Sequence, residues 1–158
     1  MSMKSLAAPL LACLVAVALI PQCRAQAGDI AVAVNPDSTA TNISLADLRK
    51  MFTGEKRTWP GGTSVKLVVR GAGCRERLVL LKLVRMSESE YKHYWSAQVL
   101  RGEADAEPLT VPSFGMAKEA LRAYPGAVAL VDSQDIKPGM KLIKVDGLLP
   151  GAAGYPLH

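Results

Sequence analysis

Histidine, cysteine and aromatic residues are scarce in this chain of 158 residues, which contains two histidines, three cysteines and 5% aromatic residues. His93 is the only internal histidine, because His158 is the last residue of the sequence, so a histidine-based metal site is poorly supported. The sequence also lacks a Ser/His/Asp arrangement and the G-x-x-x-x-G-K-[S/T] loop of nucleotide-binding enzymes. We therefore expect no catalytic residue, no metal and no cofactor.

The chain also lacks a large excess of positive or negative charge. The net charge is +5, and no run of five or more lysines and arginines occurs. Basic residues do not alternate with aromatic ones as they do on a nucleic-acid-binding surface, so we expect no nucleic acid partner. With no internal repeat or low-complexity segment, the length fits one globular domain and a targeting segment.

Residues 1–27 have the features of a secretory signal peptide. Lys4 supplies a positive start, an uncharged apolar run follows from Leu6 to Ile20, and Ala25-Gln26-Ala27 is an A-x-A cleavage site. The run is short for a transmembrane helix and no second apolar span follows, so we expect a periplasmic protein that does not span the membrane after cleavage. The alternative is a lipoprotein acylated on Cys23, although the residues before this cysteine lack the small residue that such processing requires.

Cleavage after residue 27 leaves Cys74 as the only cysteine. A single cysteine forms no intramolecular disulfide, so the exported domain must rely on its hydrophobic core. We place this domain at residues 28–146. Residues 147–158 are rich in glycine and proline and are predicted to form an irregular C-terminal tail.

Apolar strands and amphipathic helices alternate along the exported chain. The predicted order is β-α-β-α-α-α-β-β, which indicates a three-layer α/β domain with a mixed sheet. Periodicity and capping residues place strands near 30–34, 65–69, 127–131 and 141–145 and helices near 45–52, 74–85, 88–100 and 114–124. In the last helix we expect Met116, Ala120 and Leu121 to face the core.

The most informative stretch is a strand, a glycine turn and a helix between residues 65 and 85. Gly71 and Gly73 permit a tight turn, and the following helix start offers unpaired N–H groups and a partial positive charge. Arg70, Arg75 and Arg77 surround this helix end, an arrangement that suits a bound anion. The alternative is a solvated basic rim on an ordinary strand-to-helix turn.

Several short motifs follow one another along the exported chain: Asn35-Pro36, Leu45-x-x-Leu48-x-x-Met51-Phe52-x-Gly54, Trp59-x-x-Gly62, Val69-Arg70-x-x-Gly73 and Pro125-Gly126-Ala127-Val128. In this order and spacing they resemble the phosphate-binding periplasmic proteins of ABC-type uptake systems. The resemblance is closer still to the short single-lobe members of the type II periplasmic-binding-protein-like group, and it covers most of residues 29–146. It implies a three-layer α/β/α lobe with a mixed, mostly parallel sheet.

The resemblance also implies a ligand-binding loop for an oxyanion. The family loop reads approximately Arg-x-x-Gly-Ser-Gly-Thr, and the matching positions here are Arg70, Gly73, Cys74, Arg75 and Glu76. Arginine and the first glycine are kept, whereas both hydroxyl side chains are replaced, by a thiol and by a carboxylate. A thiol is a weak donor and an ionised carboxylate only accepts, so backbone N–H groups would have to supply most of the contacts.

Three function classes remain open at this point. The first is a weak binding protein for phosphate or another small oxyanion, working with a membrane permease or sensor protein of an ABC-type system. The second is a binding-protein lobe without a ligand that acts as a periplasmic partner-recognition module. The third is a cysteine enzyme using Cys74 at the basic helix start, although His93 lies on a separate predicted helix with no carboxylate to orient it.

Overall fold

The computed structural model describes residues 28–158, so the predicted signal peptide lies outside the described residues. None of the helices in this part of the chain is long and apolar enough to cross a bilayer. The elements are β1 (Ile30–Val34), β2 (Asn42–Ile43), α1 (Leu45–Phe52), β3 (Lys66–Arg70), α2 (Arg75–Val84), α3 (Glu88–Leu100), β4 (Leu109–Val111), α4 (Phe114–Ala123), β5 (Ala127–Asp132), the 3-10 helix η1 (Ser133–Asp135) and β6 (Lys141–Val145).

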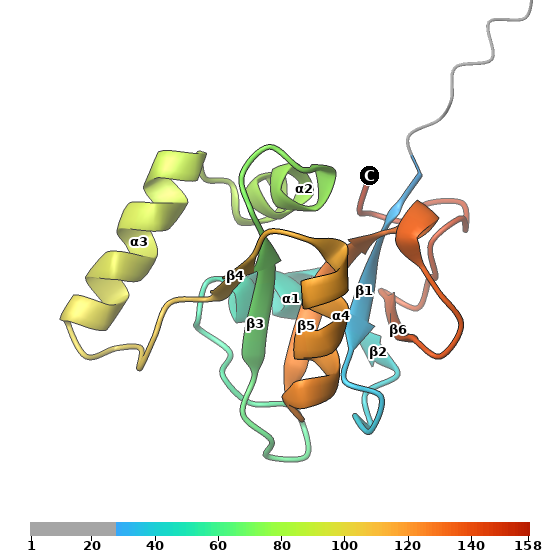
Figure 1. The fold of residues 1–158 in the computed structure, drawn as a ribbon, viewed down its shortest axis with the longest axis horizontal. Helices are drawn as coiled ribbons and strands as arrows, with labels where there is room; N and C mark the ends of the chain where they lie inside the picture. Colours follow the sequence, from blue (N-terminus) through green and yellow to red (C-terminus); the bar gives the residue numbers. More distant parts are fainter. Residues whose placement is uncertain (1–27) are drawn as a thin grey trace, which may run out of the picture.

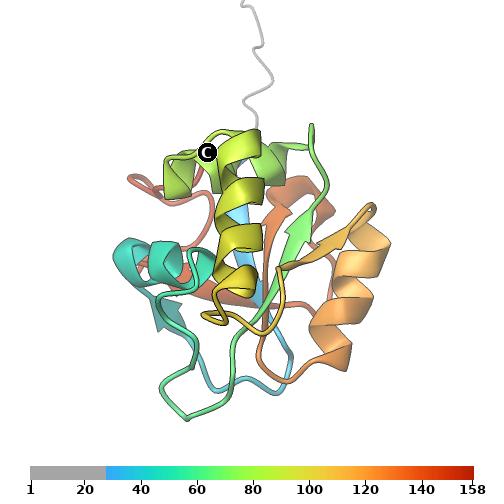
Figure 2. The same cartoon turned by 90° about the vertical axis from the view of Figure 1, so that its left-hand side faces the viewer.

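The strands form a six-stranded mixed sheet in the order β2-β6-β1-β5-β3-β4. β1 runs antiparallel to β5 and β6, whereas β3 is parallel to both β5 and β4, and β2 is parallel to β6. Helices α1 and α4 lie on opposite sides of this sheet, and α2 sits above the end of β3 (Figures 1 and 2). The predicted three-layer α/β class with a mixed, mostly parallel sheet is confirmed, since three of the five strand pairings are parallel.

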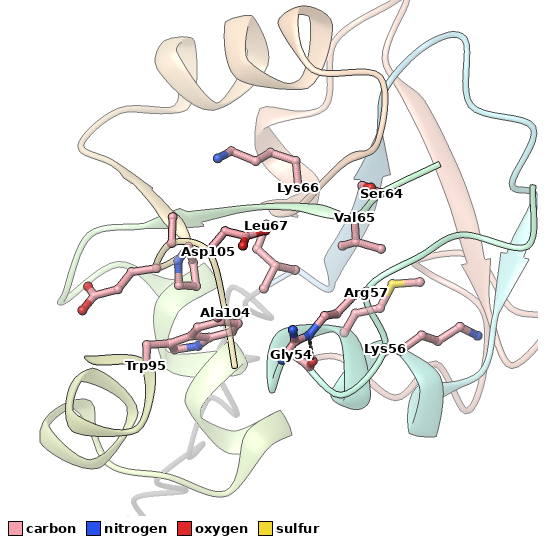
Figure 3. Close-up of a pocket in the computed structure, with 14 residues that line it drawn as sticks. Gly54, Lys56, Arg57, Ser64, Val65, Lys66, Leu67, Trp95, Ala104 and Asp105 are labelled. Carbon is pink, nitrogen blue, oxygen red and sulfur yellow. Dashed lines mark hydrogen bonds between the residues drawn. The ribbon is translucent and has the colours of Figure 1, made fainter. Parts of the chain in front are cut away.

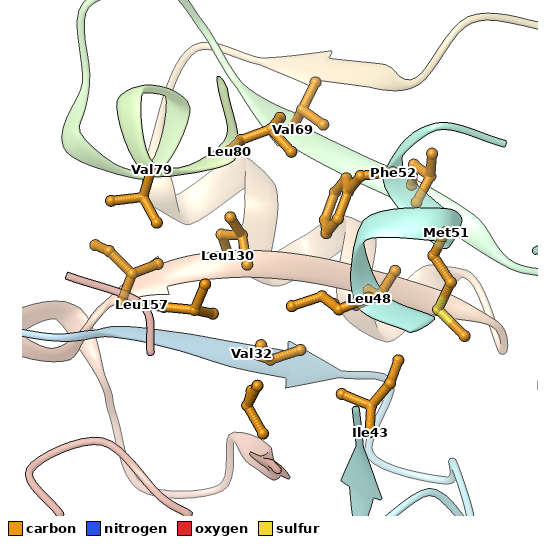
Figure 4. Close-up of a cluster of buried hydrophobic side chains, with 14 of the residues drawn as sticks. Val32, Ile43, Leu48, Met51, Phe52, Val69, Val79, Leu80, Leu130 and Leu157 are labelled. Carbon is orange, nitrogen blue, oxygen red and sulfur yellow. The ribbon is translucent and has the colours of Figure 1, made fainter. Parts of the chain in front are cut away.

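The two faces of the sheet carry side chains of different size. In β1 the valines and isoleucine alternate with alanines, and all five residues are buried. Ile30, Val32 and Val34 join the larger core under α1, α2 and α3, shown in Figure 4, whereas Ala33 joins a smaller core under α4. Because successive strand side chains point to opposite faces, the alternation in sequence builds a thick layer on one side and a close-packed layer on the other.

The buried face of α4 differs from the prediction. Met116 is 52% exposed, while Ala117, Ala120 and Leu121 are buried. The prediction that Met116 faces the core was therefore wrong, and the other two inward positions were right. Small residues occupy this face because the sheet surface beneath it is rich in alanine, so the helix can approach closely.

Residues 147–158 contain no helix or strand, yet they are fixed to the sheet. Tyr155 and Leu157 are both 3% exposed and belong to the larger core. The hydroxyl of Tyr155 donates to the carbonyl oxygen of Ile30 at 2.8 Å, and the N–H of Ile30 donates to the carbonyl oxygen of Leu157 at 2.8 Å. The irregular tail therefore completes the core beside β1.

Asn35, at the end of β1, links the sheet to the C-terminus of α4. It is 3% exposed, and its Nδ2 donates to the carbonyl oxygens of Leu121 and Tyr124 at 2.8 and 3.1 Å. Its Oδ1 accepts from the N–H of Asp37 at 2.8 Å. The buried amide thus supplies the carbonyl oxygen of Leu121 with a donor at the helix end, whereas the carbonyl oxygen of Tyr124 also accepts from the N–H of Ala127 at 3.0 Å.

Replacing Asn35 with alanine is expected to lower the free energy of unfolding by at least about 2 kcal/mol, because the buried carbonyl oxygen of Leu121 loses its donor and the links to the end of α4 are broken. Urea denaturation followed by circular dichroism measures this loss. The matched control is Asn42→Ala, since Asn42 is exposed and accepts one hydrogen bond from Gly147. Equal stability losses in the two variants would contradict the account of Asn35.

Candidate functional site

The predicted oxyanion residues lie together in the turn that joins β3 to α2. β3 ends at Arg70, Gly73 has a φ of 89°, and α2 begins at Arg75 with Cys74 as its N-cap residue. The Cys74 side chain makes no capping hydrogen bond to the helix; its Sγ instead donates to the carbonyl oxygen of Gly71 at 2.8 Å. The helix start therefore keeps N–H groups that no side chain caps, as an anion-binding turn requires.

Arg70 is a partly buried cation with one weak partner. Its side chain is 14% exposed, and its Nη1 lies 3.5 Å from Oε1 of Glu76, whose side chain is 6% exposed. Within residues 28–158 the Nε of Arg70 has no hydrogen-bond acceptor. Both charged groups border a small gap with Phe52, Leu80 and Leu130, so they face apolar surroundings with most donors of the arginine unused.

Arg75 extends from the helix start toward another part of the fold. Its guanidinium forms an ion pair with Asp132 at the end of β5 and donates a second hydrogen bond to the carbonyl oxygen of Gly28. These contacts tie α2 to β5 and to the residues before β1. The guanidinium of Arg75 is therefore engaged inside the protein, and Arg75 would contact an anion at the helix start through its backbone N–H.

Arg77 is likewise held by an internal carboxylate. It is 6% exposed and donates from Nε and Nη2 to the carboxylate of Glu88 at 2.9 and 2.7 Å. Its guanidinium also lies 4.8 Å from the ring centre of Tyr91, a cation–π contact. The arginines that the sequence groups around the turn are therefore each paired with a carboxylate, and Arg70 has the longest of the three ion pairs.

The Arg77–Glu88 pair predicts a pH-dependent stability. Hydrogen bonds from Arg77 hold the pKa of Glu88 below its ordinary value of 4.5. A carboxyl group whose pKa is lower in the folded protein stabilises it above the unfolded pKa, and this contribution is lost as the pH falls through the folded pKa. Glu88→Gln should therefore lower Tm at pH 7, and the difference from the unmutated protein should shrink toward pH 3.

Thermal denaturation between pH 3 and 7 tests this expectation. Glu119→Gln is the control, because the side chain of Glu119 is 73% exposed and lies 3.8 Å from Arg122. A Tm difference for Glu88→Gln that stays constant over the whole range would show that the ion pair is not its cause.

The carboxylates that pair with these arginines were not predicted from the sequence. Asp132 is 57 residues from Arg75 and Glu88 is 11 residues from Arg77. One signal was available for Asp132: it ends β5, which is parallel to β3, so both strands end at the same edge of the sheet. Glu88 carried no comparable signal beyond its place in the first turn of α3.

Comparison with known proteins identifies the family of this chain. The model of a family described as the PBP superfamily domain matches residues 20–154. The chain belongs to this family. Among curated proteins, the phosphate-binding protein PstS of Bacillus subtilis (strain 168) is 29% identical over 126 residues, which are 78% of this chain and 38% of that protein.

Solved structures show the same fold. The protein is similar, with a TM-score of 0.61 and 15% identity, to a putative phosphate ABC transporter substrate-binding protein from Clostridium perfringens with bound phosphate, over 77% of this chain and 46% of that one. It is also similar, with a TM-score of 0.61 and 19% identity, to an ABC-type phosphate transport receptor from Vibrio cholerae, over 77% and 47% of the two chains. The chain thus spans less than half of the length of these relatives, as expected for a single lobe of the family.

Proposed function

We propose that this protein is an exported solute-binding lobe that binds phosphate or a related small oxyanion weakly, for an ABC-type uptake or sensing system. The observation that carries the proposal is Arg70, a partly buried arginine with a buried, unpaired Nε and one long ion pair, beside a helix start that no side chain caps. The anion would contact Arg70 and the N–H groups from Gly73 to Glu76. The names of the relatives, which are phosphate-binding and phosphate-transport proteins, support this choice of ligand.

The expected affinity is low. A charge-assisted hydrogen bond contributes about 1.5–3 kcal/mol, so three such bonds supply about 5–9 kcal/mol. Association costs at least about 4 kcal/mol in lost freedom, which leaves a dissociation constant in the millimolar range. Glu76 lowers the affinity further, because its carboxylate repels an anion at the same turn. In this proposal a permease or sensor protein closing over the turn would supply the missing donors.

Calorimetric titration of phosphate and sulfate at low ionic strength tests the proposal. Arg70→Ala should abolish binding, whereas Arg85→Ala should change it little, because Arg85 follows the other end of α2. The double variant Arg70→Ala/Glu76→Ala removes both charges of the ion pair, so it separates lost binding from the instability of an unpaired carboxylate. Absence of heat with any oxyanion at tens of millimolar, about tenfold above the expected dissociation constant, would refute oxyanion binding.

A second candidate is a ligand-less lobe that recognises a partner protein in the periplasm. The observation in its favour is that Glu76 already occupies the turn as an internal counter-ion of Arg70. This candidate becomes the better account if calorimetry detects no oxyanion. In neither candidate is the protein an enzyme, in keeping with its binding-protein relatives.

We also infer that the mature protein begins at Gly28 and resides in the periplasm, from the A-x-A cleavage site at residues 25–27. Intact-mass measurement of a periplasmic extract should show the loss of residues 1–27. A diacylglycerol adduct on Cys23 would contradict this expectation and support the lipoprotein alternative.

A further inference from the structure

A second candidate site lies at the opposite end of β3 from the oxyanion turn. A cavity of about 260 Å³ opens there between the end of α1, the start of β3, α3 and the segment that leads to β4 (Figure 3). None of its lining residues belongs to the turn from Gly71 to Arg77. A ligand in this cavity would therefore bind independently of the proposed oxyanion.

The floor of the cavity is apolar and fixed by packing. Leu67 and Trp95 line it, and Trp95 is only 5% exposed. Gly54 has a φ of +74°, and a Cβ atom at this position would lie 2.8 Å from Cη2 of Trp95. The indole therefore packs directly against the backbone of Gly54, which leaves it little freedom to move. In Figure 3 Leu67, Trp95 and Arg57 frame the same space.

One wall of the cavity is cationic. Arg57 lines it, and the Nε of Arg57 donates to the carbonyl oxygen of Gly54 at 2.8 Å, which anchors the guanidinium at the cavity. Lys66 also borders the cavity, but its ammonium points to the other face of the sheet, where Nζ lies 5.3 Å from the ring centre of Tyr124 (Figure 3). The third cation, Lys56, is already paired with Asp47 at 2.7 Å.

The segment that leads to β4 supplies an acidic wall. Asp105 and Glu107 line the cavity from this segment, and Glu107 accepts a hydrogen bond from Ser96 at 2.6 Å. In residues 28–158 no ion pair joins Arg57 to either carboxylate. The two walls thus carry opposite charges that are not paired with each other, and both face the cavity between them.

We propose that this cavity binds a small zwitterion with an apolar body, namely a free amino acid with an apolar side chain. The ligand carboxylate faces Arg57, its ammonium group faces Asp105, and its side chain rests on Leu67 and Trp95. A simple anion such as phosphate does not suit this cavity, because the acidic wall with Asp105 and Glu107 repels it.

Titration of the 15N-labelled protein with L-leucine tests the proposal. The chain has two tryptophans, and only Trp95 lines this cavity. The indole N–H resonance of Trp95 should shift and saturate at millimolar leucine. Trp59 is the internal reference, because its Nε1 already donates to the carbonyl oxygen of Gly126 at 3.0 Å.

Two analogues of leucine separate the two walls. 4-Methylpentanoate lacks the ammonium group and 3-methylbutylamine lacks the carboxylate, so each should bind at least about tenfold more weakly than leucine. Arg57→Ala should weaken leucine binding by a similar factor, whereas Arg122→Ala, an exposed arginine on α4, should not. Arg57 is exposed, so its replacement is expected to leave the fold intact.

Two results would overturn the proposal: no shift of Trp95 at tens of millimolar leucine, or equal affinities for leucine and both analogues. A shift of Trp95 caused equally by phosphate would also overturn it. Shifts in the amides of Gly73 to Glu76 report the separate oxyanion site, so the failure of one proposal is distinguishable from the failure of the other.

Discussion

Replacing Glu76 with glutamine is expected to strengthen phosphate binding at least about tenfold. The substitution removes the carboxylate that lies 3.5 Å from Arg70 at the proposed site, and it keeps nearly the same side-chain volume. Two unit charges 4 Å apart interact by about 4 kcal/mol at an effective dielectric constant of about 20. Relief of even a third of this repulsion is about 1.4 kcal/mol, which is a factor of about ten in the dissociation constant.

The same substitution has a second expected effect. Without Glu76 the partly buried Arg70 loses its counter-ion, so the variant should be less stable in the absence of anion. A ligand that binds only the folded state raises stability, so phosphate should raise the Tm of Glu76→Gln more than that of the unmutated protein. Glu119→Gln, far more exposed, is the control for both measurements. An unchanged or weaker affinity in Glu76→Gln would show that Glu76 does not oppose the anion.

Gly126→Ala is expected to lower the free energy of unfolding by more than about 3 kcal/mol. A Cβ atom on Gly126 would lie 1.7 Å from the carbonyl oxygen of Ser64, which is backbone and cannot rotate away. The carbonyl oxygen of Gly126 also accepts hydrogen bonds from the N–H of Lys66 at 2.9 Å and from Nε1 of Trp59 at 3.0 Å. Any displacement of Gly126 therefore disturbs the alignment of β3 with β5.

Gly61→Ala is the matched control for this prediction, because a Cβ atom at Gly61 meets nothing within 4 Å. Chemical denaturation should show a stability within about 0.5 kcal/mol of the unmutated protein for Gly61→Ala. If Gly126→Ala is equally stable, the close approach of β3 and β5 at this point is not required for the fold.

The helices and the four longer strands were predictable because each had a local signal. The alternating residues of β1, the glycine turn after β3 and the serine caps of α1, α3 and α4 were all read from short stretches of sequence. The strands β2 and β4 were missed, since two and three residues carry no detectable periodicity. The orientation of α4 was partly wrong because the buried face depends on the alanine-rich sheet beneath it.

For the candidate site, the sequence predicted the place of the residues and not the pairing of their charges. Arg70, Gly73 and Cys74 lie in one turn because they are neighbours in the chain. The partners of Arg75 and Arg77 come from other elements, and such pairs depend on how β5 and α3 pack against α2. Local sequence therefore overstated the number of free cations around the turn.

The most direct test of the proposed function is to record which backbone amides respond to phosphate. In a 15N-labelled protein titrated with phosphate at low ionic strength, we predict saturable shifts of the N–H resonances from Gly73 to Arg77 at millimolar concentration. These shifts should be larger in Glu76→Gln and absent in Arg70→Ala. If phosphate shifts no amide of this turn in either the unmutated protein or Glu76→Gln, the turn between β3 and α2 is not an oxyanion site.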